Sequence, residues 1–173
     1  MTCIEISPDT SITEKISWAE ACYKKYKNTF LEDNEVRQLL TEFRKASSES
    51  AKEMVSIGLV DECRKCEEEE GGACCGKGIE NRYSGTLLLI NLLLGVTLPE
   101  DAPDDKSCFF LCKKGCSLIA RHTICLNYIC KKITDRIPAH TLNQLREKEG
   151  KELNTLFILN EKVKSILKNI NEC

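Results

Sequence analysis

Apolar residues recur every three to four positions near the N-terminal end of the chain, which is the spacing of an amphipathic helix. The first such run comprises Ile12, Ile16, Ala19, Tyr23 and Tyr26, and the second comprises Val36, Leu39, Leu40, Phe43 and Ala46. Ser11 or Thr13 is suited to cap the first helix, residues 32–34 offer a break, and Gly58 offers a stop. We therefore expect a helical hairpin or a longer helical arm between residues 12 and 60.

The same period returns from about His140 to the C-terminus. Its apolar stripe comprises Leu153, Leu156, Phe157, Ile158, Val163, Ile166, Leu167 and Ile170. We expect Gly150 to separate this helix from a shorter one around residues 141–148. A stripe of this kind is most often the face by which a helix docks on its own core. The alternative is a contact with a protein partner, for example in a homodimer through the C-terminal helix.

The clean helical period is lost from about residue 61 to 135, where nine of the 12 cysteines fall. Neither a Pro- or Ser-rich linker nor an internal repeat divides the sequence. The pattern thus predicts an all-α fold in one domain, residues 1–173, with helices flanking an irregular cysteine-rich centre at about 61–135. We expect residues 67–70, four consecutive Glu, to form a solvated loop.

Charge and hydropathy then narrow the classes of partner. The formal net charge is -2, which gives no electrostatic reason to expect nucleic acid or an anionic membrane surface as a partner. The longest apolar run, residues 87–94, is interrupted by Asn91 and is far shorter than the roughly 20 residues that span a bilayer. Residues 1–9 lack the basic and apolar regions of an export signal. We therefore expect a cytoplasmic protein.

Cytosolic reductants keep thiols free for metals or catalysis, whereas a secreted module would use its cysteines in disulfides. We favour free thiols. Cys63 and Cys66 have two residues between them, so a tight turn could bring both sulfurs to one metal ion. The side chains of the adjacent Cys74 and Cys75 tend to diverge, so they can serve different metals, or one can ligate while the other packs. The glycines around this pair, at 71, 72, 76 and 78, suit a backbone that approaches a metal centre closely.

A second cysteine-rich segment lies more than 30 residues further on and contains Cys108, Cys116, Cys125 and Cys130. Together the two segments predict a metal centre drawn from both, which would make metal binding part of folding. Eight candidate ligands exceed one tetrahedral site, so either two metals bind, a multinuclear cluster forms, or some thiols lie outside the coordination sphere. Cys112 is more typical of a small apolar core residue, although on a helix it would share a face with Cys108 and Cys116.

Thiolate donors suit zinc and an iron–sulfur cluster alike, and the spacing does not separate the two. We expect Cys3, Cys22 and Cys173 to be core or surface thiols, and His122 to be more often a neighbour of the site than a ligand. The main hypothesis is a metal-binding protein for electron transfer or metal handling. The alternative is an enzyme built around the cluster, an oxidoreductase or a protein-modifying methyltransferase, although no nucleotide-binding loop supports it.

The order of the cysteine motifs resembles the YkgJ-type cysteine-rich family of zinc- or iron-chelating domains. Cys63, Cys66, Cys74 and Cys75 match its CxxC and CC motifs, and Cys108, Cys116 and Cys125 match its later cysteines. The resemblance covers roughly residues 63–130 and implies a zinc or iron–sulfur centre held by these residues. Two departures are the seven residues between Cys66 and Cys74 and the His122-Thr123 pair where the family has Pro after Arg. A related domain occurs in flagellin lysine methylases, which is the footing for the enzyme alternative.

Overall fold

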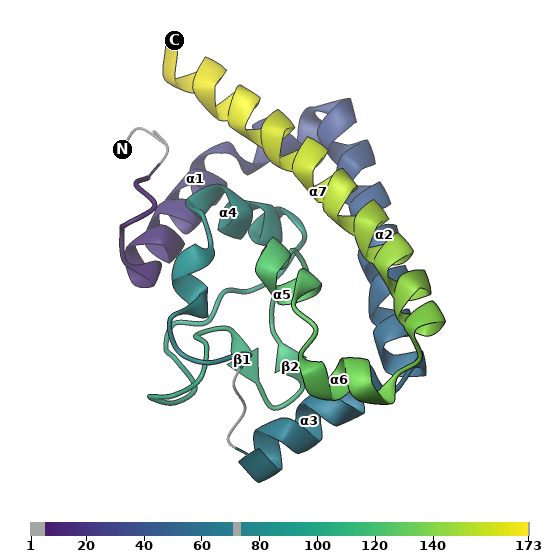
Figure 1. Cartoon of the computed structure of the whole chain (residues 1–173). Coiled ribbons are helices and arrows are strands. Elements are labelled where there is room, and N and C mark those ends of the chain that lie inside the picture. The colour runs from purple at the N-terminus through teal and green to yellow at the C-terminus, as the bar shows by residue number, and fades with distance from the viewer. Residues whose placement is uncertain (1–5, 71–73, 173) are drawn as a thin grey trace.

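The structure, a computed structural model, describes residues 6–70 and 74–172 and is mostly helical (Figure 1). In chain order its elements are α1 (Ile12–Glu32), α2 (Asn34–Ser56), α3 (Leu59–Glu70), the 3-10 helix η1 (Ile79–Arg82), α4 (Gly85–Leu93), β1 (Leu111–Cys112), β2 (Gly115–Cys116), α5 (Thr123–Asn127), α6 (Lys131–Arg136) and α7 (Ala139–Glu172). The predicted helical character is confirmed. The prediction of a purely α fold is wrong in one detail, because β1 and β2 pair as a short antiparallel hairpin.

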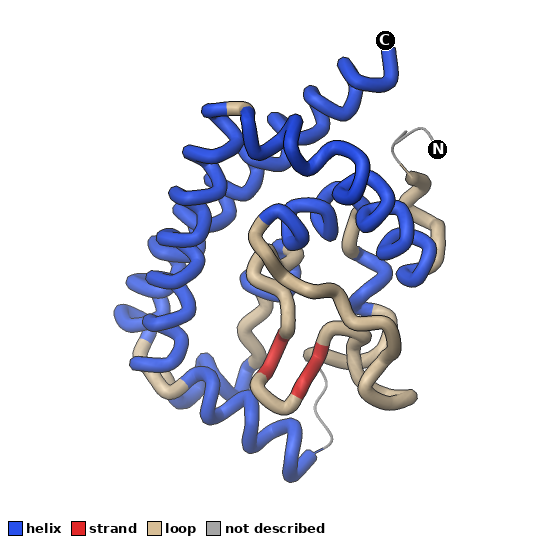
Figure 2. The backbone as a smooth tube through the Cα atoms, turned by 180° about the vertical axis from the view of Figure 1, so that it is seen from behind, coloured by secondary structure: helices blue, strands red, loops and turns tan. Residues whose placement is uncertain are grey.

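The predicted break between the first two helices is confirmed and has a clear cause in capping. Ser11 caps α1 through a capping box, in which its hydroxyl accepts from the Glu14 amide and the Glu14 carboxylate accepts from the Ser11 amide. Asp33 ends α1 and caps α2 by accepting a 3.0 Å hydrogen bond from the Val36 amide. The two helices diverge from this residue, and α2 packs along α7 instead of along α1 (Figures 1 and 2). The result is a helical arm and not a hairpin.

Helix α7 runs without interruption through Gly150, so the predicted separation at this residue is wrong. A glycine inside a helix costs only about 1 kcal/mol relative to alanine, and packing of α7 on α2 and α4 offsets that cost. Most of the predicted stripe faces the protein's own core. Leu156, Val163 and Leu167 are buried there, whereas Phe157 and Ile158 are exposed.

The apolar run at residues 87–94 forms α4 and the end of that helix, in the middle of the main core. Ser84 caps the helix, and Gly85 lets it approach the indole ring of Trp18 on α1. No helix within residues 6–70 and 74–172 combines the length and the apolar character needed to cross a bilayer.

A second, smaller core lies where α3, α6 and the start of α7 meet, and it is built on Leu59, Ile133, Ile137 and Leu145. The expected irregular centre is therefore partly helical. Cys63 and Cys66 lie on α3 and not in a tight turn, and residues 67–70 continue that helix instead of forming a loop. The irregular backbone is concentrated between α4 and α5, where a long loop carries the β hairpin (Figure 2).

Candidate metal centre

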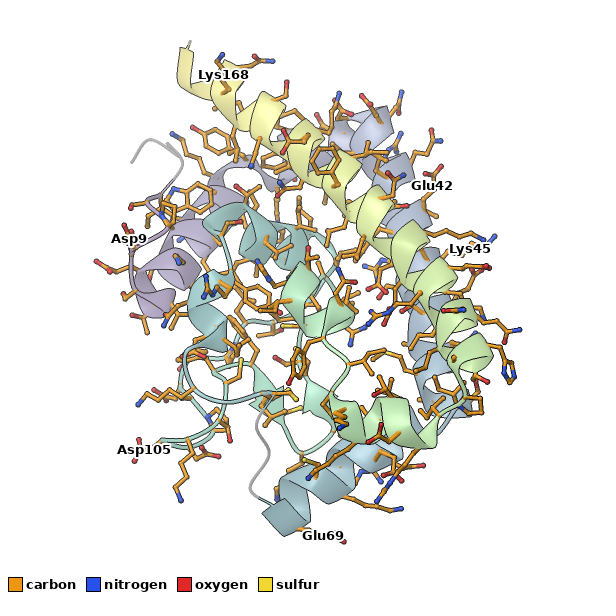
Figure 3. All side chains as sticks on the ribbon, viewed as in Figure 1. Asp9, Glu42, Lys45, Glu69, Asp105 and Lys168 are labelled. Carbon is orange, nitrogen blue, oxygen red and sulfur yellow. The ribbon has the colours of Figure 1, made fainter. Side chains whose placement is uncertain are left out.

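The eight cysteines predicted as ligands are distributed over several elements, from α3 at one end of the molecule to α5 near its centre (Figure 1). Figure 3 marks this end by Glu69 on α3 and Asp105 on the long loop, whereas Lys168 lies at the opposite end. The cysteines lie on α3 (Cys63, Cys66), in a turn (Cys74, Cys75), in the long loop (Cys108), on β2 (Cys116), on α5 (Cys125) and before α6 (Cys130). All eight are free thiols.

Four of these thiols, Cys75, Cys108, Cys116 and Cys125, form what we call the inner group. Backbone pairing joins its first two members, because the Cys108 amide donates to the Cys75 carbonyl at 2.6 Å. The Lys77 amide donates to the Lys106 carbonyl at 2.7 Å in the same pairing. Cys108 and Cys125 also contact the main core, which fixes this group against α1 and α4.

The segment between Cys116 and Cys125 is held by two side chains that sequence reasoning did not single out. The Asn91 amide nitrogen donates to the carbonyls of Leu87 and Ala120, and its oxygen accepts from the amides of Ile119 and Ala120. The buried Tyr83 hydroxyl accepts from the His122 amide at 3.1 Å and donates to the Cys125 sulfur at 3.8 Å. In the sequence, Asn91 could have been recognised as a polar residue inside a long apolar run.

The other four thiols, Cys63, Cys66, Cys74 and Cys130, form the outer group. Cys63 and Cys66 are three residues apart, so they share a face of α3. Cys130 immediately precedes α6 and packs on the small core that α6 shares with α3. Arg136 on α6 also pairs with Glu62 on α3, next to Cys63. Each group therefore combines both cysteine-rich segments, and the adjacent Cys74 and Cys75 belong to different groups.

The pKa of several thiols is shifted by burial and by the cysteines that lie nearby. Burial, followed by the neighbouring Cys74, Cys130 and Cys66, raises the pKa of Cys63 to about 11. In the inner group, burial and then Cys116, Cys108 and Cys125 raise the pKa of Cys75 to about 12, with a smaller contribution from Cys74 of the outer group.

The pKa values of Cys108 and Cys116 are raised as well. Burial raises the pKa of Cys108 to about 11 and also raises that of Cys116. Cys63, Cys75 and Cys116 keep part of their surface in solvent, but the protein atoms around their sulfurs still disfavour the charged form. These thiols are therefore protonated at neutral pH in the absence of a cation.

The described side chains do not form a finished coordination sphere. Among residues 6–70 and 74–172, no three Cys, His, Asp or Glu side chains are arranged so that they could hold a metal ion. Cys112 is exposed on β1, where it pairs with Gly115 of β2, so the expected helical or buried position is wrong. Cys22 is buried in the main core as expected but is disulfide-bonded, which corrects the expectation of a free thiol. Cys3 and Cys173, and the glycines at 71 and 72, lie outside the described residues.

Comparison with known proteins gives no relative: no family model, no curated protein and no solved structure matches the chain.

Proposed function

We propose that this protein binds zinc or an iron–sulfur cluster through eight cysteines, four in the inner group and four in the outer group. One observation carries the proposal: free thiols from distant parts of the chain lie close enough to Cys63, and others close enough to Cys75, to add to the rise that burial causes in the pKa of each. A cation placed among such thiols reverses this effect, because it stabilises the thiolate form. Metal handling or electron transfer is the function that such a site supports.

The donor set fits these metals. Thiolates are soft ligands that favour zinc and iron over magnesium or calcium, and four thiolates complete a tetrahedral zinc site. The order of the cysteine motifs, which resembles the YkgJ-type domains, supports the same conclusion. Cytosolic reductants would keep the eight thiols free for ligation, so the expected cytoplasmic location belongs to this proposal as well, whereas the disulfide of Cys22 is a bond more typical of oxidising compartments.

Binding requires the thiols of each group to close on the ion from the positions described above. Cys74 and Cys75 lie in the turn at 74–78, and Cys108 and Cys116 lie in the segment 106–117. Neither segment contains a long helix that would resist adjustment. Metal binding would then release the protons that these thiols carry at neutral pH, so affinity falls as the pH is lowered.

The test is metal analysis, sulfide analysis and a visible spectrum of protein purified without oxygen, with one variant for each group. We expect Cys63→Ser/Cys66→Ser to lose the metal of the outer group and Cys108→Ser/Cys116→Ser to lose the metal of the inner group. Cys112→Ser is the matched control, since it removes a free thiol of the same region that belongs to neither group. Iron and sulfide with a broad visible band identify a cluster, and colourless protein with zinc identifies zinc sites.

The proposal fails if purified protein carries no metal and takes up neither zinc nor iron after reduction. It also fails if both double variants retain the full metal content of the parent protein. Loss of metal in Cys112→Ser alone would contradict the division into two groups.

A further inference from the structure

A pocket of about 250 Å³ lies between the start of α4, the segment that leads into α5, and α7. None of the eight thiols lines the pocket, and part of its lining belongs to the main core. Residues from three distant parts of the chain meet there, because α4 and α5 both pack against α7. The pocket is therefore a feature of the folded protein and not of one loop.

One side of the pocket is basic. Arg82, Arg121 and His122 line it, and no lining residue is acidic. The side chain of Arg82 makes no hydrogen bond or ion pair with another described residue. Its charge lies close enough to His122 to lower the pKa of that imidazole further, after the larger effect of burial.

Arg121 makes no hydrogen bond to an oxygen among the described residues, but it forms an ion pair with the buried Glu152. Its guanidinium nitrogens contact the sulfur of Met54 at 3.8 and 3.9 Å, and the nearest carboxylate, that of Glu152, is 3.9 Å away. This last distance is too long for a hydrogen bond, although a guanidinium offers five N–H donors. Arg82 has no ion pair among the described residues, and Arg121 keeps N–H donors that its ion pair with Glu152 does not use. Together they indicate a site for an anion, because planar guanidinium groups match carboxylate and phosphate oxygens.

The apolar part of the lining is formed by Leu87, Leu153, Leu156 and Phe157. Phe157 is 64% exposed, which is unusual for a large aromatic side chain on a helix whose neighbours face the core. An aromatic ring at the rim can cover the apolar part of a ligand. The volume, below the roughly 300 to 1,000 Å³ of pockets for drug-sized ligands, limits the ligand to a small molecule.

We propose that this pocket binds a small organic anion, with its carboxylate or phosphate group on Arg82 and Arg121 and its apolar body against Phe157 and the leucines. The proposal does not depend on the metal sites, because no thiol lines the pocket. The pocket nevertheless adjoins the inner group through His122, whose amide is bonded to the same Tyr83 hydroxyl that contacts Cys125. Two hydrogen bonds, both made by the Tyr83 hydroxyl, thus connect a residue of the pocket lining to a proposed ligand.

The test is calorimetric titration of the purified full-length protein with 3-phenylpropionate, with phenyl phosphate and with the neutral 3-phenylpropionamide. We expect saturable 1:1 binding of at least one anion, and binding of the amide that is weaker by about tenfold or more. The two anions distinguish a carboxylate ligand from a phosphate ligand. Arg82→Gln should weaken binding about tenfold and Phe157→Ala several-fold, and both residues are exposed, so the variants should fold.

Two matched controls separate this site from general surface effects. Arg37→Gln removes an exposed arginine of α2, and Val55→Ala truncates an apolar side chain that is 63% exposed, almost the same as Phe157. Both should leave affinity unchanged. The proposal is overturned if neither anion binds saturably, if the amide binds equally well, or if Arg82→Gln and Phe157→Ala bind the anions as the parent protein does. If the protein binds no metal but still binds the anion, the proposed metal function fails and the inference about the pocket stands.

Discussion

Single buried side chains determine where the cysteine-bearing loops lie. Asn91 uses both the nitrogen and the oxygen of its amide to hold residues 119 and 120 against α4. Lys15 is buried too, and its ammonium donates to the carbonyls of Pro8 and Asn81, which joins the N-terminal segment to η1. Such groups are stabilising only while every donor and acceptor is satisfied, so these positions tolerate little change.

Gly85 gives a prediction about close packing. A Cβ added there would lie 2.5 and 2.8 Å from two ring carbons of Trp18, closer than nonbonded atoms approach. Because Trp18 is buried, the ring cannot move freely, and we expect Gly85→Ala to lower the free energy of unfolding by about 1 to 3 kcal/mol. Urea denaturation measures the change.

Gly150→Ala is the matched control for this prediction. This glycine also lies in a helix, but a Cβ there would meet no atom within 4 Å. We expect this variant to be more stable by up to about 1 kcal/mol, since alanine favours the helix more than glycine does. Equal effects of the two substitutions would show that propensity, and not contact with Trp18, governs Gly85.

The helix start at Ser11 and the break at Asp33 could be predicted from the sequence, because they depend on hydrogen bonds within a few residues. The continuity of α7 through Gly150 could not, because the local preference of glycine to end a helix is outweighed by packing on α2. The same applies to Cys63 and Cys66. Their CxxC spacing is compatible with a turn or a helix, and Leu59 packing on Ile133 favours the helix.

At the scale of elements, the contact between α2 and α7 contains unusual buried charge. Glu149 and Glu152 of α7 are almost completely buried, and neither oxygen of Glu152 has a hydrogen-bond partner among the described residues. Arg146 satisfies one oxygen of Glu149 at 2.8 Å and also donates to the carbonyls of Leu126 and Asn127 at the end of α5. Arg121 forms an ion pair with Glu152 at 3.9 Å, so each buried carboxylate has a guanidinium nearby that compensates part of the cost of its burial.

This burial predicts a pH dependence. Burial raises the pKa of Glu149 above 4.5, and Arg146 only partly opposes the shift. Between 4.5 and the raised value the folded protein binds more protons than the unfolded chain at this residue, so its contribution to stability is lost as the pH rises through that window. We expect Glu149→Gln to remove this part of the pH dependence and to gain stability relative to the parent protein as the pH rises towards 7.

Urea denaturation at several pH values from about 4.5 to 7 measures this effect, with unfolding followed by circular dichroism. Glu147→Gln serves as control, because Glu147 is an exposed carboxylate on the same helix. It should leave the pH dependence unchanged. If Glu149→Gln is destabilised equally at every pH, then the bond to Arg146 outweighs the burial of the carboxylate.

At the scale of the whole molecule, the two thiol groups are attached to two different cores. The inner group adjoins the main core around α1 and α4, and the outer group adjoins the small core of α3 and α6. The sequence could show where the cysteines are concentrated, between residues 63 and 130, and their role as ligands stays a prediction. It could not predict how they divide, since that depends on backbone pairing between residues 75–77 and 106–108 and on contacts between helices far apart in the chain.

This arrangement predicts that metal removal opens one end of the protein and leaves the rest folded. After treatment with a chelator under reducing conditions, the amides of Lys77 and Cys108, whose hydrogen bonds join the two cysteine segments, should lose protection from hydrogen exchange. Buried amides of α4 should remain protected, because Leu88, Leu89 and Ile90 are completely buried in a core that consists mainly of aliphatic and aromatic side chains. Far-ultraviolet circular dichroism should change little. Simultaneous exchange of all amides would instead mean that the metal sites hold the entire fold, and unchanged exchange everywhere would mean that the thiols bind no metal that matters to the structure.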